Sequence, residues 1–326
     1  MFAKNHSQKA IAEAIGKHKS VVSRELKRNA DPTSGGYHAA LAEQKYLWRK
    51  KNKPQKKRFT PEIQASVDAL LSMDYSPQQV CGRLKREGKP TVSHERIYQY
   101  VWAQKKDGGT LHEHLRRKGR KYRKRGAAKD SRGILKDRVG IELRPAIVDQ
   151  KCRLGDLEID TIIGKNHKGA ILTINDRLSS KVWMGLLKGK DAQELAQMAI
   201  KLLAPYSTII QTITADNGKE FAQHKLIAKR LEASFYCARP YHSWERGANE
   251  NTNGLIRQYF PKGASFDEIT QEDVRKVQNS LNNRPRKKLN FLTPNDFFYK
   301  IWLNLKLNLQ VEFSNQKNKP QNLFFD

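Results

Sequence analysis

The spacing of hydrophobic residues along the chain changes near residue 154. Over roughly the first hundred residues they recur every three or four positions, which predicts short amphipathic helices. After residue 154 they gather in short runs rich in isoleucine and leucine, separated by turn residues, which predicts strands. We therefore expect an all-helical N-terminal part followed by an α/β part.

The helical part contains two candidate helix-turn-helix units. In the first, Gly16 allows a turn and Ser20 can cap the next helix, which places Val22 and Leu26 inward. Four polar residues of that second helix are left to face DNA: Ser23, Arg24, Lys27 and Arg28.

The second unit has clearer helix boundaries. Ser76, Pro77 and Gln79 supply an N-cap, a proline at the first helical position and a capping-box glutamine. Ser93 caps the following helix, whose candidate groove contacts are His94, Arg96 and Gln99. For both units the alternative is an ordinary helical hairpin with a solvated polar face.

The α/β part predicts a mixed five-stranded sheet with helices. The expected elements are strands over LEIDTIIG, GAILTINDR and KVWMGLL, a helix over 190–204, a strand over TIIQTITAD, a helix over 219–232, the strand SFYCA and a helix from about 244 to 259. The first three strands form an antiparallel meander. This order is typical of an α/β domain of ribonuclease H-like type.

The domain boundaries follow from these patterns and from charge. We expect a helix-turn-helix unit with a basic tail over residues 1–58, a second unit over 59–115, a basic linker over 116–150, the ribonuclease H-like domain over 151–300 and a tail over 301–326.

The formal net charge of +29 makes a large polyanion the expected partner, because so large a surplus repels itself. Residues 45–58 contain no acid, and the segment RRKGRKYRKR over 116–125 is basic at all but two positions. Beside helix-turn-helix units, such runs favour phosphate contacts over solvated tails. The second run supplies five candidate DNA contacts: Arg116, Arg117, Lys118, Arg120 and Lys121.

The composition also indicates where in the cell the protein is expected. The apolar runs fall far short of the roughly 20 residues that span a bilayer, so no membrane association is expected. The three cysteines form no CxxC pair, which is typical of a reduced cytosolic protein. We expect a cytoplasmic protein.

Three acidic residues suggest a catalytic site. Alternation along the first strand places Glu158 and Asp160 on one face, and Asp160 lies nearer the strand end, so Glu158 is the weaker candidate. Asp216 ends another strand, and Glu250 lies on the last predicted helix, where it shares a face with Asn253 and Arg257. Arg257 is expected to hold a phosphate beside the carboxylates.

Two strand-borne aspartates and a helix-borne glutamate suit a phosphodiester-cutting site with two Mg²⁺ ions, for which Mn²⁺ can substitute. Mg²⁺ prefers oxygen ligands in octahedral geometry, and a pair of ions about 3.5–4 Å apart can activate the attacking oxygen and stabilise the leaving one. Each carboxylate alone is more often a surface charge than a ligand. Their combination favours a metal site formed by Asp160, Asp216 and Glu250.

Six motifs resemble the DDE transposases of the insertion-sequence-thirty family. They are SRELKRN (23–29), YSPQQVCGRLK (75–85), GDLEIDTIIGK (155–165), TADNGKEFA (214–222), YHSWERGANENTNGLIRQYFPKG (241–263) and LNNRPRKKLNFLTP (281–294). The resemblance covers roughly residues 7 to 298. It implies that Asp160, Asp216 and Glu250 are catalytic, that Mg²⁺ is the cofactor, and that terminal inverted repeats and target DNA are the substrates.

The implied reaction frees a 3′-hydroxyl at an element end by hydrolysis, and this hydroxyl then attacks target DNA without a covalent protein intermediate. Residues expected to support the site or contact double-stranded DNA are Asn217, His242, Trp244, Arg246, Asn249, Asn253 and Arg257. Joining two DNA ends requires at least two active sites, so a homo-oligomer on DNA at the bacterial nucleoid is expected.

Two departures from the family pattern leave an alternative open. Only MFAKNH precedes Ser7, where family members have a further helix, so a truncated first unit or a misassigned start codon is expected. The tail beyond Tyr299 also differs. An inactive, transposase-derived DNA-binding protein is one alternative, and a nuclease for RNA–DNA hybrids is another, which the paired helix-turn-helix units disfavour.

Overall fold

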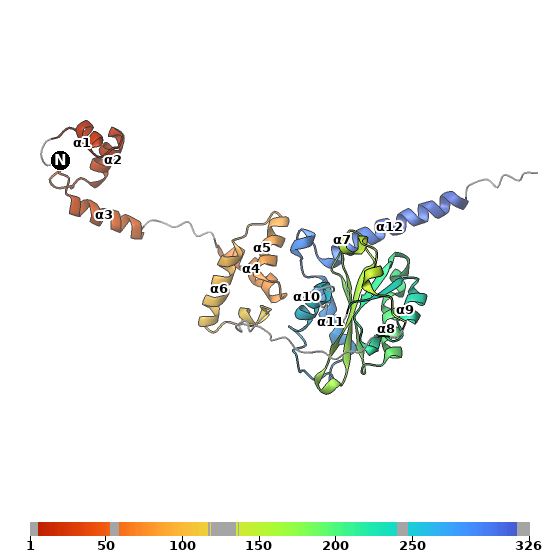
Figure 1. The fold of residues 1–326 in the computed structure, drawn as a ribbon. Coiled ribbons are helices and arrows are strands. Elements are labelled where there is room, and N and C mark those ends of the chain that lie inside the picture. The colour runs from red at the N-terminus through yellow and green to blue at the C-terminus, as the bar shows by residue number, and fades with distance from the viewer. Residues whose placement is uncertain are drawn as a thin grey trace, which may run out of the picture. The chain divides into compact units, whose positions relative to one another are not determined.

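The chain forms two compact units, Met1–Arg58 and Phe59–Asp326. The computed structural model describes residues 6–52, 59–116, 118, 135, 137–239 and 247–317 (Figure 1). Six candidate contact residues lie outside the described part: Arg117, Arg120, Lys121, His242, Trp244 and Arg246.

The first unit contains the helices α1 (Gln8–Ala14), α2 (Lys19–Asn29) and α3 (Ala39–Asn52). Gly16 makes the predicted turn in the left-handed region, at φ +62°. The predicted cap of α2 was wrong: His18, rather than Ser20, is the N-cap. A ring nitrogen of His18 accepts the Ser20 backbone N–H at 3.3 Å, and the helix begins two residues earlier than a Ser20 cap allows.

Helix α3 was not predicted, because its basic residues were assigned to a tail. It is tied to α2 by Asn29, which is buried and accepts a hydrogen bond from Arg49 at 2.7 Å. Lys45 also donates to the Ala30 carbonyl at 2.6 Å. The part of the basic run that is described therefore belongs to the folded unit.

The second unit begins with the helices α4 (Pro61–Ser72), α5 (Pro77–Arg86) and α6 (His94–Lys106). The predicted capping box of Ser76 and Gln79 is confirmed, as is the Ser93 cap of α6. Val80 and Ile97 are fully buried in a core that α4 shares. Helix α4 was missed, although its Thr60 cap followed by proline was a readable start signal.

The sheet confirms the predicted ribonuclease H-like fold. Its strands are β1 (Asp156–Ile163), β2 (Ala170–Asp176), β3 (Val182–Leu187), β4 (Thr212–Ala215) and β5 (Ser234–Cys237). The order is β3-β2-β1-β4-β5, in which β1, β2 and β3 are antiparallel neighbours and β4 and β5 run parallel to β1. Strand β4 is shorter than predicted, because a 3-10 turn (Ala204–Ile209) precedes it.

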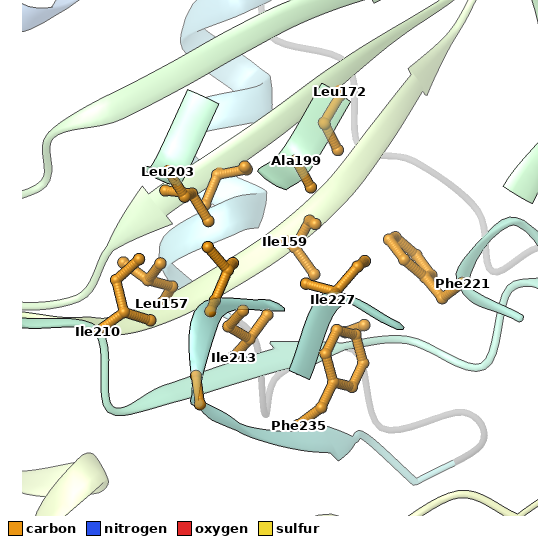
Figure 2. Packing of buried hydrophobic residues seen from close by; sticks show 14 of the residues in the cluster. Leu157, Ile159, Leu172, Ala199, Leu203, Ile210, Ile213, Phe221, Ile227 and Phe235 are labelled. Carbon is orange, nitrogen blue, oxygen red and sulfur yellow. The ribbon is translucent and has the colours of Figure 1, made fainter. Parts of the chain in front are cut away.

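Four helices cover the two faces of the sheet: α8 (Ala192–Leu203), α9 (His224–Leu231), α10 (Gly247–Ile256) and α11 (Gln271–Asn282). Leu157 and Ile159 of β1 pack with α8 and α9 in one core (Figure 2). Ile162 packs with α10 and α11 in a second core. Because side chains alternate along a strand, the acidic residues of β1 that precede Ile162 share the face that α10 covers.

The helical hairpin of the second unit is docked on the α/β domain. Tyr75 and Gln79 donate to the carbonyls of Asn283 and Pro285, each at 2.8 Å. Tyr259 donates to Asp74 at 2.7 Å and also contacts the buried Arg284. These contacts come from residues about 180 to 210 positions apart in the sequence.

Residues 137–150, assigned to the linker, also pack on this domain. They include a 3-10 turn (Ile141–Leu143) and the short helix α7 (Ile147–Gln150). The Cys237 N–H donates to the Val139 carbonyl at 2.8 Å, which adds a backbone contact at the β5 edge. Helix α12 (Pro294–Lys317) continues past the predicted boundary at residue 300, and none of the helices in the described part could cross a membrane.

Lys181 provides a test of how α12 is held. Lys181 is only 4% exposed, its Nζ donates to Asn295 at 2.6 Å and lies 4.3 Å from the Tyr299 ring centroid. Burial lowers the Lys181 pKa from 10.5 to about 8.

Between pH 8 and 10 the unfolded chain therefore binds more protons at this residue than the folded protein does, and this residue's contribution to stability rises with pH. We expect Lys181→Met to reduce the rise in unfolding free energy between pH 8 and 9.5, measured by urea denaturation. Identical pH slopes for the variant and the wild type would contradict the buried position of this amine.

Candidate active site

Asp160 lies on β1, the central strand of the sheet. Its Oδ1 accepts the Thr161 N–H at 2.9 Å, and its Oδ2 accepts the side-chain amide of Asn253 at 2.8 Å. Asn253 also accepts a hydrogen bond from Thr173 of β2 at 3.3 Å. The orientation of the Asp160 carboxylate is therefore fixed from β1, β2 and α10.

Asp216 directly follows β4, the parallel neighbour of β1. Glu158 is opposite Thr214 in this pair, so Asp160 and Asp216, each two residues further on, lie at the same level of the sheet. Adjacent strands are about 4.8 Å apart. Asp216 is 8% exposed, and its Oδ1 accepts the Gly218 N–H at 2.8 Å. The structure thus places the two predicted aspartates at adjacent strands, Asp160 within β1 and Asp216 immediately after the end of β4.

Glu250 lies in the first turn of α10, and its side chain is exposed. Its neighbour Asn249 donates its backbone N–H to Glu158 at 2.9 Å, and Asn253, one turn later, holds Asp160. Helix α10 is thereby attached to β1 on both sides of Glu250.

The donor set matches Mg²⁺ in chemical type, because all three predicted ligands are carboxylates. Within the described ranges, however, no three His, Cys, Asp or Glu side chains converge closely enough to hold a metal ion. The two aspartates are level on the sheet, whereas Glu250 extends toward solvent.

Glu158 forms an ion pair, as expected for the weaker ligand candidate. It is 1% exposed and accepts a hydrogen bond from Arg177 at 2.8 Å, and the Arg177 side chain is 4% exposed. Asn249 is also fixed by Asn175 of β2, whose side-chain amide donates a hydrogen bond to the Asn249 side-chain oxygen. Glu158 therefore connects a buried cation with the beginning of α10.

Glu220 is a site residue that the sequence analysis missed. It is buried, and its Oε1 accepts the Thr161 hydroxyl at 3.0 Å. A Cβ on Gly218 would lie 2.6 Å from Glu220 Oε2 and 2.9 Å from Asp216 Oδ1, so a larger residue at this position would displace both carboxylates. The sequence signal that could have identified Glu220 was its position four residues after Asp216 in the same motif.

Cys237, on the strand next to β4, is not an available nucleophile. Burial raises the pKa of its thiol to about 11, Arg138 opposes this rise, and Asp216 adds to it. The thiol is therefore protonated at neutral pH, and only a thiolate is an effective nucleophile.

The structure separates the other predicted contacts into two groups. On α2, the four candidates are exposed, as are Arg96 and Gln99 of α6, whereas His94 is half-buried and contacts Glu95 at 2.8 Å. The predicted DNA contacts near Asp160 and Asp216 also form hydrogen bonds or packing contacts with other residues of the chain.

Asn217 bonds with Arg138 at 2.6 Å and with the Ala238 carbonyl at 2.6 Å, which fixes the loop after Asp216. Arg257 lies within 3.3–3.4 Å of the Pro261 and Ile163 carbonyls. Arg116 packs against Gly254 of α10, and Lys118 is exposed.

Comparison with known proteins identifies relatives over most of the chain. A helix-turn-helix domain family matches residues 1–29. The chain is 56% identical over 295 residues to the transposase for insertion sequence element IS4351 of Bacteroides fragilis, covering 90% of each protein. It is 34% identical over 305 residues to the transposase for IS1086 of Cupriavidus metallidurans, covering 90% of this chain and 88% of that one.

A further relative is the transposase InsI for IS30A of Escherichia coli K12, at 34% identity over 305 residues, with 89% of this chain and 78% of the relative covered. Among solved structures, the catalytic core domain of BIV integrase matches with a TM-score of 0.35 and 20% identity, covering 47% of this chain and 97% of that one.

The ion pair beneath α10 yields a stability prediction. Arg177→Met leaves the Glu158 carboxylate buried without its cation, and we expect the unfolding free energy to fall by about 3–5 kcal/mol. Adding Glu158→Gln removes the buried charge but keeps an acceptor for the Asn249 N–H, so most of the stability returns. Arg230→Met, at an exposed arginine of α9, serves as the matched control.

Urea denaturation of the four proteins measures these differences. Equal stability of the single Arg177 variant and the double variant would show that the Glu158 charge is solvated despite its burial.

Proposed function

Because the chain belongs to the insertion-sequence transposases, within the insertion-sequence-thirty family, we propose that Asp160, Asp216 and Glu250 are the catalytic triad with which it cuts and joins DNA. The observation that carries this proposal is that Asp160 on β1 and Asp216, immediately after β4, lie at the same level of two adjacent strands. Glu250 follows on a helix attached to the same strand by Glu158 and Asn253.

The reaction assigned to this site is hydrolysis at an element end, which frees a 3′-hydroxyl, followed by attack of that hydroxyl on target DNA. Two Mg²⁺ ions held by the triad would supply an activated water and stabilise the leaving oxygen, and Mn²⁺ is expected to substitute. Asn253 fixes the Asp160 carboxylate, and the Gly218 N–H fixes that of Asp216. No covalent intermediate is needed, in agreement with the protonated Cys237 thiol.

DNA binding is assigned to both helical units and to the basic residues around them. The exposed polar residues of α2 and α6 are proposed to read the terminal inverted repeats in the major groove, while Lys and Arg side chains contact phosphates. Two element ends require two active sites, so we infer a homo-oligomer on DNA. A DNA substrate places this activity at the nucleoid in the bacterial cytoplasm.

A transposase-derived protein that binds DNA without cutting it is the second candidate. The exposed Glu250 side chain favours it, because this carboxylate does not converge with the aspartates. Under the first proposal, DNA and metal draw Glu250 toward Asp160, since a dication offsets the repulsion among three carboxylates.

Asp216→Asn separates these candidates. The amide retains an oxygen to accept the Gly218 N–H, so the fold and DNA binding are expected to persist, whereas metal-dependent cleavage should fall by at least about a thousandfold, comparable to the loss of a dominant electrostatic group. The substrate is a plasmid carrying the gene's own flanking DNA with Mg²⁺, and new 3′ ends are mapped.

Glu272→Gln is the matched control, because this exposed carboxylate lies on α11 against the edge strand β3. Cleavage by the Asp216 variant at the wild-type rate would remove Asp216 from the site. Binding by the wild type with no cleavage under any divalent ion would favour the non-cutting candidate.

Helix α6 supplies a separate test of DNA recognition. Arg96 lies within 3.3 Å of Gln99, and both are exposed. If they contact bases, Arg96→Ala should weaken binding to the element end by about 1–3 kcal/mol and binding to unrelated DNA much less. Lys201→Ala, at an exposed residue of α8, is the control, and electrophoretic mobility shifts measure both affinities. An equal loss on both DNAs would make Arg96 a phosphate contact.

A further inference from the structure

Two consecutive polar residues, Gln258 and Tyr259, follow closely after the helix that carries Glu250. Their backbone N–H groups donate to the carbonyls of Leu255 and Ile256, each at 3.0 Å, so they continue the hydrogen bonding of α10. Gln258 is 7% exposed, and burial raises the pKa of the Tyr259 hydroxyl, which is therefore protonated at neutral pH. A shift of these two residues is transmitted to α10 along its own backbone.

The Tyr259 hydroxyl contacts three separate segments of the chain. It donates to Asp74, in the turn between α4 and α5, at 2.7 Å. It lies 2.7 Å from the hydroxyl of Ser280 on α11, and it accepts a hydrogen bond from Arg284. A phenol hydroxyl has one hydrogen to donate, so Ser280 and Arg284 are the donors to its oxygen while the hydrogen points at Asp74.

Gln258 forms a second link between the same segments. Its side-chain nitrogen donates to the carbonyl of His114, in the 3-10 turn after α6, at 3.2 Å, and its side-chain oxygen accepts from Arg284 at 3.1 Å. Arg284 is 2% exposed and contacts both residues from the α/β domain. His114 Nδ1 also lies 2.9 Å from Asp74. The two partners on the side of the helical hairpin, Asp74 and His114, therefore contact each other.

Asp74 has a backbone conformation that depends on its surroundings. Its φ of +62° lies in the left-handed region, which is uncommon for residues other than glycine. Such a conformation persists where neighbouring contacts specify it, and the Asp74 carboxylate is contacted by both His114 and Tyr259. The turn between α4 and α5 is therefore fixed in part by a residue that follows α10.

We propose that Gln258 and Tyr259 are positioning residues that link α10 to the helical hairpin of α4 to α6, so that the placement of Glu250 depends on the docked hairpin. Asn253, which orients Asp160, lies six residues before Tyr259. The proposal rests on the proposed function, because it takes Glu250 and Asp160 as catalytic carboxylates. A misplacement of about 1 Å can cost about a hundredfold in rate, so a loosened link should slow cleavage while DNA binding persists.

Hydrogen exchange of the full chain tests the link without metal, DNA or cleavage. Tyr259→Phe removes one hydroxyl, and Asp74→Gly removes the carboxylate from the hairpin side while suiting the left-handed φ. In each variant we expect the amides of α10 to exchange about tenfold faster, the effect of losing a hydrogen bond to a charged group. Because both changes break the same contact, the double variant should exchange at the rate of the faster single variant.

Two references separate this effect from a general loss of stability. The amides of α9, on the other face of the sheet, should exchange at the wild-type rate in every variant. Tyr100→Phe removes a matched tyrosine–aspartate contact inside the hairpin, where Tyr100 donates to Asp68 at 3.0 Å, and should leave α10 unchanged. Equal acceleration in α9 and α10 would make the role one of overall stability and would overturn the proposal.

Cleavage and DNA affinity supply the second readout. With saturating element-end duplex and Mg²⁺, single-turnover cleavage by Tyr259→Phe and by Asp74→Gly should be about ten- to a hundredfold slower than by the wild type. Affinity measured without divalent ion, and cleavage by Tyr100→Phe, should stay at the wild-type values. Gln258→Met breaks the second link alone and should act in the same direction, so it replaces Tyr259→Phe if that variant does not fold.

The two readouts keep this proposal separate from the catalytic one. Faster α10 exchange in Asp74→Gly, with no cleavage even by the wild type, would support the link and contradict the proposed function. Unchanged α10 exchange in Asp74→Gly, or cleavage by both variants at the wild-type rate, would overturn the positioning role.

Discussion

The contact on which the catalytic half depends is the attachment of α10 to the central strand β1. Glu158 accepts the backbone N–H of Asn249, and Asn253 donates to Asp160. Both contacts join a buried strand to a helix about ninety residues later in the sequence. The helix that carries Glu250 is therefore positioned by two polar contacts as well as by the apolar packing of Leu255 and Ile256.

This arrangement places several charges inside a protein whose surface is strongly basic. Asp156 and Glu158 are almost fully buried on one face of β1, while Leu157 and Ile159 fill the core on the other. Burying a carboxylate is unfavourable unless it is paired, and here Arg153 and Arg177 pair with the two acids. Paired cations thus stabilise the buried acids on the polar face of β1, and the proposed metal ligand Asp160 is the next acid on that face.

Sequence patterns were sufficient for the features that depend on local chemistry. The capping box at Ser76, the meander of β1 to β3 and the strand-end position of Asp216 all follow from short-range spacing. Helix α3 was missed because its basic composition resembled a tail, although alanine, leucine and lysine favour helices.

The remaining features depend on contacts between distant segments. Arg138 reaches Asn217 across 79 positions, and Thr161 reaches Glu220 across 59. The residue pattern within one segment does not reveal which distant segment packs against it. Residues 137–150 were therefore assigned to a linker, and Glu220 was overlooked. The contacts of Arg257 with the carbonyls of Pro261 and of Ile163 on β1 are likewise not recorded in the pattern of α10, and its expected contact with a phosphate stays a prediction.

The docking of α5 on the α/β domain has a consequence for the DNA itself. The helical hairpin is joined to the segment that follows α10 by Asp74, which contacts Tyr259, and Tyr259 in turn contacts Arg284. Tyr75 and Gln79 add two further contacts. Helix α6 and Asp160 thus belong to one folded body. DNA turns once in about 10 base pairs, so under the proposed function a groove read by α6 and a bond cut near Asp160 would keep a constant helical phase. Under the proposed function, the length of an element end would then be determined by the protein fold, and an inserted base pair would rotate the cut site away from the proposed carboxylates.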